Sequence, residues 1–594
     1  MCSWEGPVDC SVESSSTAVP SWDLLFRETK KTTQPPLSLE HMKPYFQRFS
    51  EQISLYTRAL HVRCSTKDER EKFPDSLTPL PKEMIMETRA ALRFATLCLA
   101  KEETRSQMQR EAIVTYRWHQ ALCQSLSRRK GDLKCRLLAA RLLSNLVTCN
   151  YETAGVVASD VGLSPSHEMV KSRIRTTLSK FTNEKSVENN CEDPTWVDMI
   201  LACAQSGCRE GLAATAAALH NCISSIHLKQ PGADNSYAKK VASDDLLIST
   251  LLRQVLPADS ITSLTNDDEN SHFDAATEWI VLTIEKLCHL GLLSEMYVSA
   301  GGQSDLTTSK TVYVTAEHVV LLHCAARGVE EATHLTGSGQ QLFLGGEAGS
   351  DAIVSSCIFL AEKLSSLRGV LSNSTVKQPT SDYESLDLTK SAWFLFLEML
   401  ASSLGVDEQS AINRARLLLG RETSLIQDIA LDLGSVFDSL SAKNHGRKAR
   451  ELSMSEDEQR SIVGLIRLLG NVCYRCRKNQ DLIRQTIVPL SALPADVSGL
   501  NNPLHQRTAL HVLLSCTSFS YGCFTLREWA IVALRNVLEG NEANQELVEK
   551  LEAQEPLQSA ELEKMNLRVD MNRQGEVRIV PLNKPDKCTE EERT

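Results

Sequence analysis

The residues with the clearest potential for chemistry are Cys473 and Cys476, which form a C-x-x-C motif. That spacing is typical of zinc ligands or of a redox pair. A structural zinc site needs four ligands, however, and the neighbouring sequence offers no second C-x-x-C and no H-x3-H. Cys203 and Cys208 are similarly without a second pair. We therefore expect these thiols to be structural, and we expect no metal ligands and no cofactor.

Other catalytic patterns are weak as well. The stretch 336–341 is rich in glycine like a phosphate-binding loop, but no Gly-Lys-Ser or Gly-Lys-Thr follows it. The 14 histidines are scattered along the chain, and no convincing Ser/His/Asp set accompanies them. The sequence therefore predicts a protein that is not an enzyme and has no catalytic residues.

Composition narrows the class of protein further. The chain has 594 residues, so it needs several domains or one extended repeat array. Lys and Arg number 64 against 75 Asp and Glu, and the resulting net charge of −11 disfavours nucleic acid as a partner. No apolar stretch reaches the ~20 residues of a membrane span, and the first residues lack a signal-peptide pattern. We expect an intracellular, cytoplasmic protein.

The secondary structure that must position any site is helical. Aromatic residues make up only 5% of the chain, which is unusual for an all-β protein. Long segments instead place apolar residues at i, i+3, i+4 and i+7, the period of an amphipathic helix. The clearest predicted helices cover 84–100, 107–126, 133–148, 212–226, 278–293, 315–327 and 353–367.

Changes in composition divide the chain into four parts. Residues 1–38 are rich in Ser, Thr and Pro and are expected to be a flexible tail. Residues 39–230 are expected to form N-terminal armadillo-like repeats, and 231–450 middle helical repeats with mobile loops. Residues 451–594 form the best-defined block, which we treat as a C-terminal domain.

Two segments of this last block, 468–483 and 533–548, match each other without a gap. Six of sixteen positions are identical: Leu469 with Leu534, Asn471 with Asn536, Val472 with Val537, Asn479 with Asn544, Gln480 with Gln545, and Leu482 with Leu547. Fainter copies contain Asn145 and Asn221. An apolar helix, an Asn near its end, a polar turn and a new helix are typical of armadillo repeats, which stack into a solenoid.

The repeated amides allow two roles. An Asn can end its helix and tie adjacent turns together, or it can belong to a ladder that meets the main chain of a partner. The candidates are Asn145, Asn221, Asn471, Asn479, Gln480, Asn536, Asn544 and Gln545. Peptide receptors of the nuclear-import type also carry Trp four residues before the Asn, where this chain has Arg141, Ala217, Arg467 and Val532. A transport or adaptor receptor for extended peptides therefore stays only an alternative.

The C-terminal block resembles the ataxin-10 family. Residues 466–481 are similar to the family's IGNLCY…NQD motif, and 524–536 followed by Asn544 and Gln545 are similar to its REWAIYAIRNL…NQ motif. The tail at 548–580 resembles the family as well, so the likeness covers about 460–582. The two Asn sites lie 65 residues apart, against about 42 for an armadillo unit, which predicts an insertion near 491–511.

The resemblance implies an armadillo-like cytoplasmic protein without enzymatic activity, acting as a scaffold through protein contacts of its solenoid surface. It implies roles in cytokinesis and cell division, in cilium or centrosome function, and in cell survival. Fungal relatives are linked by name to copper transport, so a metal-handling protein is a less favoured alternative. Neither the partners nor the oligomeric state can be predicted.

Two further features are expected to be structural. In the helix before Asn536, Trp529 and Leu534 are expected to pack within the fold, with Leu534 in the core and Arg535 in solvent. Near the C-terminus apolar residues alternate with polar ones, which predicts a β-hairpin at 566–581. We expect it to cap the last repeat; the alternative is a free tail that adds a strand to a partner's sheet.

Overall fold

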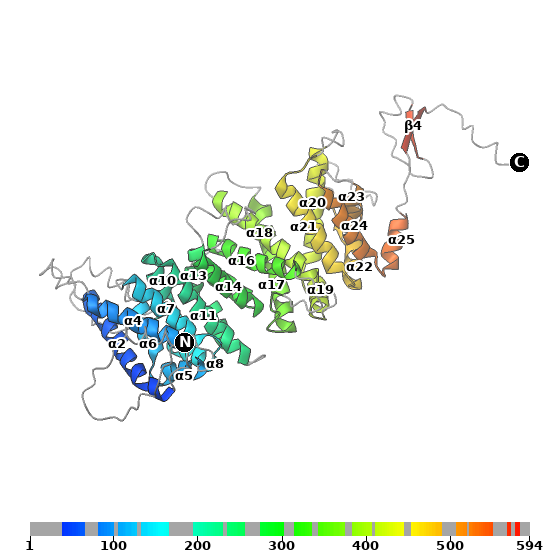
Figure 1. Ribbon diagram of the computed structural model, residues 1–594. Helices are drawn as coiled ribbons and strands as arrows, with labels where there is room; N and C mark the ends of the chain where they lie inside the picture. Colours follow the sequence, from blue (N-terminus) through cyan, green and yellow to red (C-terminus); the bar gives the residue numbers. More distant parts are fainter. Residues whose placement is uncertain are drawn as a thin grey trace, which may run out of the picture. The chain divides into compact units, whose positions relative to one another are not determined.

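The computed structural model describes residues 39–65, 81–99, 105–127, 132–164, 194–229, 235–255, 274–301, 314–334, 343–374, 383–406, 410–444, 453–489, 507–518, 522–550, 567–571 and 577–581. The chain divides into two compact units, Met1–Ser403 and Leu404–Thr594. Helices make up most of both units, which confirms the all-α helical-repeat prediction (Figure 1). The finer boundaries at 230 and 450 stay predictions. The tail 1–38 and the glycine-rich stretch 336–341 lie outside the described residues.

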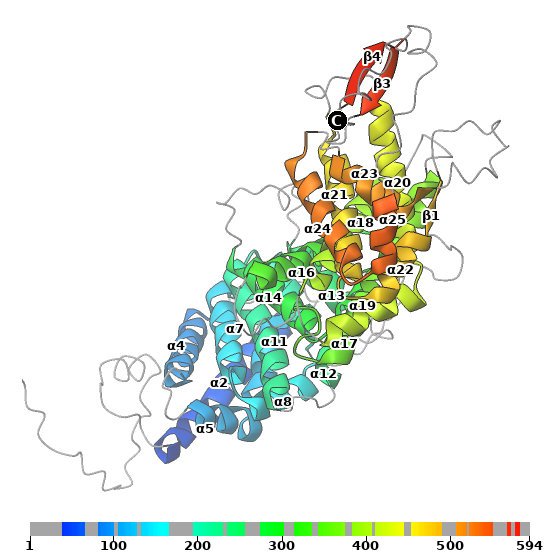
Figure 2. The same ribbon diagram turned by 90° about the vertical axis from the view of Figure 1, so that its right-hand side faces the viewer.

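The first unit is a series of helices that recur in groups. In chain order they are α2 (Leu39–Ser65), α4 (Lys82–Leu99), α5 (Arg105–Arg110), the π-helical η2 (Glu111–Thr115), α6 (Trp118–Ser127), α7 (Leu133–Val147), α8 (Tyr151–Asp160), α10 (Trp196–Gln205), α11 (Arg209–Lys229), α12 (Ser236–Ala242), α13 (Asp245–Val255), α14 (Ala275–His289), α15 (Leu293–Ala300), α16 (Ala316–His334), α17 (Ser350–Ser374) and α18 (Tyr383–Leu404). Helix α11 packs between α7 and α14 (Figure 2). Helix α10 packs in the same way between α6 and α13. Equivalent helices therefore stack on one another, as neighbouring repeats of a solenoid do.

The second unit repeats the same arrangement. Its elements are α19 (Ser410–Glu422), α20 (Leu425–Lys443), α21 (Glu456–Cys473), α22 (Arg477–Gln485), β1 (Ile487–Val488), β2 (Arg507–Thr508), α23 (Ala509–Ser518), α24 (Phe524–Leu538), α25 (Glu542–Lys550), β3 (Leu567–Met571) and β4 (Val577–Pro581). Helix α20 packs against α23, α21 against α24, and α22 against α25. Two successive three-helix repeats therefore stack helix on helix.

Two pairs of strands accompany these helices. β1 and β2 are antiparallel, with Ile487 opposite Thr508, so residues 507–511 belong to β2 and the start of α23. The last five residues of the insertion expected at 491–511 therefore lie in β2 and the first turn of α23, and 490–506 lie outside the described residues. β3 and β4 form the predicted C-terminal hairpin. Its expected packing on the helices lies outside what the structure describes.

The prediction of one continuous helix over 107–126 is wrong. Helix α5 passes into η2, and Arg117 then adopts a left-handed φ of 53° before α6 begins. The turn brings the buried Trp118 against Phe46 and Phe49, with ring centroids 5.0 and 4.1 Å apart. Aromatic burial of this kind stabilises the break, although the apolar periodicity runs straight across it.

Helices α16 and α23 begin with the same Thr-x-x-His cap. The backbone N–H of Thr315 donates to Nδ1 of His318 at 3.0 Å, and that of Thr508 donates to Nδ1 of His511 at 3.1 Å. His318 Nε2 lies 2.9 Å from the carbonyl oxygen of Tyr297, to which it donates. Both caps need a neutral imidazole, and burial lowers the pKa of both histidines.

Acidification is expected to destabilise the protein partly through these caps. Because the folded pKa of His318 lies below its ordinary 6.5, the stabilisation is complete above that pH and is lost as the pH falls toward the lowered pKa. His318→Gln keeps an acceptor at the third helical position, as in a capping box, but cannot titrate. Its melting temperature should therefore drop less than that of the wild type between about pH 7.5 and about pH 5.5. Equal drops would contradict this role of His318.

Candidate functional site

Most of the predicted amides lie at the turns that connect a long helix to the short helix after it. In each such turn the middle residue is left-handed: Cys149 between α7 and α8 (φ 54°), Arg475 between α21 and α22 (φ 51°), and Gly540 between α24 and α25 (φ 66°). The residue that follows occupies the N-cap position of the short helix. Oδ1 of Asn541 accepts from the backbone N–H of Asn544 at 3.1 Å.

Cys476 holds this N-cap position in front of α22 and makes no side-chain cap. Its C-x-x-C partner, Cys473, is buried at the end of α21, where desolvation raises the pKa of its thiol well above the ordinary value. The two cysteines are thus the last residue of one helix and the cap position of the next. Among the described residues no group of three or more His, Cys, Asp or Glu side chains could hold a metal ion.

Cys149→Gly is expected to stabilise the first unit by about 0.5–1 kcal/mol, because a left-handed residue with a Cβ is strained by about 1–2 kcal/mol and glycine recovers part of this cost. Cys149 is exposed, so little packing is lost. The reciprocal change, Gly540→Ala, should destabilise the second unit by about 1 kcal/mol, although a Cβ there meets nothing within 4 Å. Urea denaturation of both variants tests the pair, and shifts of the same sign would rule the explanation out.

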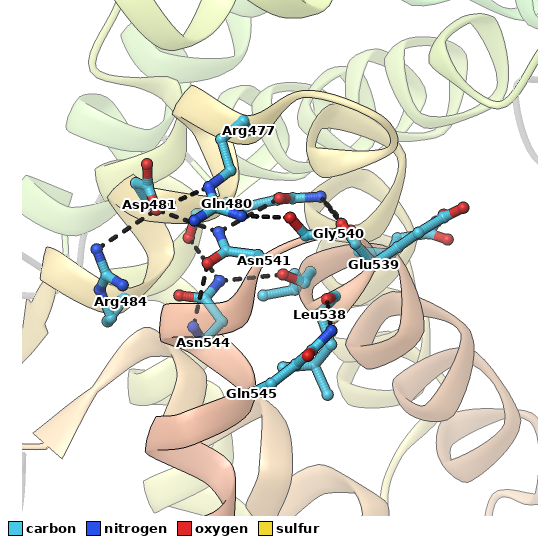
Figure 3. Close-up of polar contacts among 12 residues, drawn as sticks. Arg477, Gln480, Asp481, Arg484, Leu538, Glu539, Gly540, Asn541, Asn544 and Gln545 are labelled. Atoms are coloured by element: carbon cyan, nitrogen blue, oxygen red, sulfur yellow. Dashed lines mark hydrogen bonds and ion pairs between the residues drawn. The ribbon is translucent and has the colours of Figure 1, made fainter.

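Gln480 lies at the centre of the last junction (Figure 3) and is only 2% exposed. Its Nε2 donates to the carbonyl oxygens of Asn536 at 2.9 Å and Glu539 at 3.1 Å, at the end of α24. Its Oε1 accepts from Nδ2 of Asn541 at 3.3 Å. Carbonyls at a helix end have no partner within the helix, so a glutamine from the preceding repeat supplies one.

Asn479 and Asn544 repeat one geometry 65 residues apart, and both are fully buried. Nδ2 of Asn479 donates to the carbonyl of Val472 at 2.8 Å and to that of Arg416 in α19 at 2.7 Å. Nδ2 of Asn544 donates to the carbonyls of Val537 at 3.0 Å and Gln480 at 3.1 Å. Each amide therefore links its own long helix to the short helix of the preceding repeat. We call this set of side-chain amides the amide ladder.

The first unit contains the same ladder, in residues that sequence comparison missed. Nε2 of the buried Gln109 donates to the carbonyls of Asn145 at 2.6 Å and Thr148 at 3.1 Å, and its Oε1 accepts from Asn150 at 3.0 Å. Oγ1 of Thr153 donates to the carbonyl of Leu146 at 2.8 Å, as Asn544 does to Val537. Polar residues five and eight positions after Asn145 and after Asn536 are the signal that could have revealed Asn150, Thr153 and Asn541.

Arg416 takes the place of the glutamine at the junction between α19 and α21. Its Nε donates to the carbonyl of Asn471 at 3.0 Å, and its Nη2 to that of Leu404 at 2.6 Å. The buried guanidinium lies 5.0 Å from the ring centroid of Tyr474. A cation in this position binds the same helix-end carbonyl that Gln480 binds one repeat later.

The other predicted site residues are less uniform. Nδ2 of Asn536 donates to the carbonyl of Gly470 at 3.2 Å, and that of Asn221 to Oγ1 of Thr148 at 2.9 Å, so both connect neighbouring repeats. The side chains of Asn145 and Asn471 are half-buried. Gln545 is exposed, and its Nε2 donates to the carbonyl of Leu538 at 2.8 Å.

The two residues expected to be structural in α24 differ from one another. Trp529 is half-buried, and the guanidinium of Arg467 lies 5.0 Å above its ring. Leu534 was expected in the core but is only half-buried, while Ala533 and Val537 occupy the core positions of this helix. As expected, Arg535 is exposed.

The ladder joins repeats and leaves few free amides for a ligand. Gln480, Asn479, Asn544 and Asn536 are buried and donate to main-chain carbonyls of this chain. A partner's main chain would have to break these bonds to reach them. Exposed charged side chains lie next to the ladder on the short helices, for example Arg477 in α22 and Glu542 in α25.

Within the described ranges no helix is long and apolar enough to cross a lipid bilayer.

Comparison with known proteins points to one family. The profile of the spinocerebellar ataxia type 10 protein domain matches residues 485–580. The chain is 26% identical to ataxin-10 of Xenopus tropicalis over a region that covers 38% of this chain and 47% of that protein. It is 28% identical to the ataxin-10 homolog of Dictyostelium discoideum over 21% of this chain and 17% of that protein. For human ataxin-10 the identity is 31%, over 18% of each chain. These matches thus span half or less of each relative.

Proposed function

The chain is a member of the ataxin-10 family, and from this premise we propose that it is a non-enzymatic scaffold that binds other proteins through its helical repeats. Its proposed location is the cytoplasm, and its proposed roles are in cytokinesis, in cilium or centrosome function, or in cell survival. The proposal extends to the whole chain, although the similarity to relatives covers only part of it.

The observation that carries the proposal is the internal use of the amide ladder. The polar side chains that recur from repeat to repeat donate to carbonyls of neighbouring repeats in both units. Such bonds fix the stacking of the repeats, and they leave recognition to the exposed side chains of each repeat. A rigid array with variable exposed residues suits protein binding better than catalysis.

The alternative of a receptor for extended peptides is disfavoured by the same geometry. Such receptors need amides that are free to bind the peptide main chain, whereas Asn536 is buried and donates to Gly470. The residue four positions before it is Val532 rather than Trp. The copper-handling alternative predicts stoichiometric metal in the purified protein, and elemental analysis that finds none would remove it.

Affinity purification with mass spectrometry tests the scaffold proposal. The full-length protein is compared with a chain that lacks residues 404–594, a cut that removes the second compact unit. We expect a reproducible set of proteins with the full-length bait, part of which is lost with the second unit. Recovery of no protein above an unrelated bait, in several cell states, would count against a scaffold.

A further inference from the structure

The last long helix exposes a face that its predecessor buries. Helices α21 and α24 align with an offset of 65 residues, since they end at Cys473 and Leu538 and are followed by equivalent turns. In α21 the residues Ile466, Leu469 and Cys473 are fully buried. They lie on the same helix side as Gly470, where an added Cβ would stand 2.8 Å from the Cα of Ala533 in α24. The following repeat is therefore what covers this face.

The equivalent residues of α24 are Ile531, Leu534 and Leu538, and we call them the end face. Ile531 is 50% exposed, and Leu534 and Leu538 are half-buried. No described helix follows α25, so the array supplies no further repeat to cover the end face within the described residues. Terminal repeats of a solenoid need a cover because their stacking surface is apolar.

The chain itself provides a segment of suitable reach and pattern. Helix α25 ends at Lys550, and the 16 residues 551–566 precede β3. A chain of that length spans up to about 50 Å, against about 22 Å for the whole length of α24.

The register of the hairpin supplies the matching surface. Val569 pairs with Ile579, Met571 with Val577, and Leu567 with Pro581, so apolar positions stand directly opposite each other. Alternate strand positions share a face, which places these six positions on one face and Arg568, Asp570, Arg578 and Val580 on the other. A two-stranded hairpin is marginal alone in water and needs a surface to pack on.

We propose that the β3–β4 hairpin docks through its apolar positions on the end face of α24 and closes the repeat array. The occupant is a segment of the same chain rather than a second copy or another protein. The reasons are that the tether is long enough to reach the face and that the register places the apolar positions of the hairpin opposite one another.

Two matched substitutions in the full-length protein test this docking. Ile531→Asp places a charge on the end face. Ile487→Asp makes the same chemical change in β1, outside α24, at a position that is 53% exposed. Val569→Asp alters the hairpin side of the contact. The readouts are hydrogen exchange at 567–571 and 577–581, the melting temperature, and the mass in solution.

Docking predicts that Ile531→Asp and Val569→Asp each raise amide exchange in both strands at least about tenfold, while Ile487→Asp changes it less than about twofold. The double variant of Ile531→Asp and Val569→Asp should be no worse than either single variant, because both break one contact. Equal effects of Ile531→Asp and Ile487→Asp would overturn the proposal. Unchanged amide exchange in the two strands of Ile531→Asp would also overturn the proposal. If that variant then dissociates from an oligomer, the end face binds a second copy of the chain. If it instead loses a co-purified protein, the end face binds that protein.

Discussion

Gly420→Ala is expected to destabilise the second unit by about 2–4 kcal/mol, although the same change in an ordinary helix stabilises it by about 1 kcal/mol. Gly420 lies in α19, and a Cβ there would stand 1.8 Å from Oδ1 of Asn479. Asn479 cannot retreat, because it is fully buried and its Nδ2 donates to Arg416 and Val472. The added methyl group must therefore break two buried hydrogen bonds or push α19 away from α22.

Urea denaturation of the full-length protein measures this effect, and Gly155→Ala is its matched control. Gly155 also lies inside a helix, α8, but a Cβ there meets nothing within 4 Å. That variant should be more stable by about 0.5–1 kcal/mol. In the combination Gly420→Ala with Asn479→Ala, the clash is absent, so the cost should be well below the sum of the two single costs. An additive pair would show that Gly420 does not contact the ladder.

The gap-free match between 468–483 and 533–548 predicted the positions of the ladder amides but not their bonds. Asn479 and Asn544 stand at equivalent places, and the sequence assigns both to a turn between helices. Their acceptors are carbonyls of another repeat, which have no side-chain signature. Arg416 shows the same limit. It donates to the helix-end carbonyl of Asn471 as Gln480 donates to that of Asn536, but an arginine and a glutamine are not matched when residue types are aligned.

Leu469 and Leu534 show why burial could not be transferred between copies. The two residues are identical in type and position, and the amphipathic pattern of each helix predicts a core residue. Leu469 is fully buried in α21, a helix against which the next repeat packs through α24, whereas Leu534 is half-buried in α24, which no described repeat follows. Periodicity reports which face of a helix is apolar, and the neighbouring repeat decides whether that face is buried.

The break at Arg117 has a similar cause. Apolar periodicity continues from α5 to α6, and no proline or glycine interrupts it, so the sequence predicted one helix over 107–126. The packing of Trp118 against Phe46 and Phe49 joins residues about 70 positions apart, a contact that a local pattern cannot contain.

Gln480→Ala is expected to cost about 3 kcal/mol, because it removes the side-chain donor that binds the carbonyls of Asn536 and Glu539 in a buried site. It also removes one of the two acceptors of the Asn541 amide, which keeps its bond to Asp481. The repeat supplies its own control in Gln545, which occupies the equivalent position of α25. Gln545 is exposed and makes one bond, to the carbonyl of Leu538. Gln545→Ala should therefore cost less than about 1 kcal/mol in the same urea titration.

Replacement by glutamate separates hydrogen bonding from shape at this junction. Gln480→Glu keeps the size of the side chain but turns the donor that faces Asn536 and Glu539 into an acceptor. Two carbonyl oxygens would then face a buried carboxylate. Gln480→Glu should therefore destabilise the protein at neutral pH at least as much as Gln480→Ala does. Part of this stability should return on acidification, because the protonated carboxyl group can donate a hydrogen bond. Gln545→Glu, with its side chain in solvent, should stay within about 0.5 kcal/mol of the wild type. If Gln480→Glu proved as stable as the wild type, packing rather than donation to the helix end would be what holds α24 to α22.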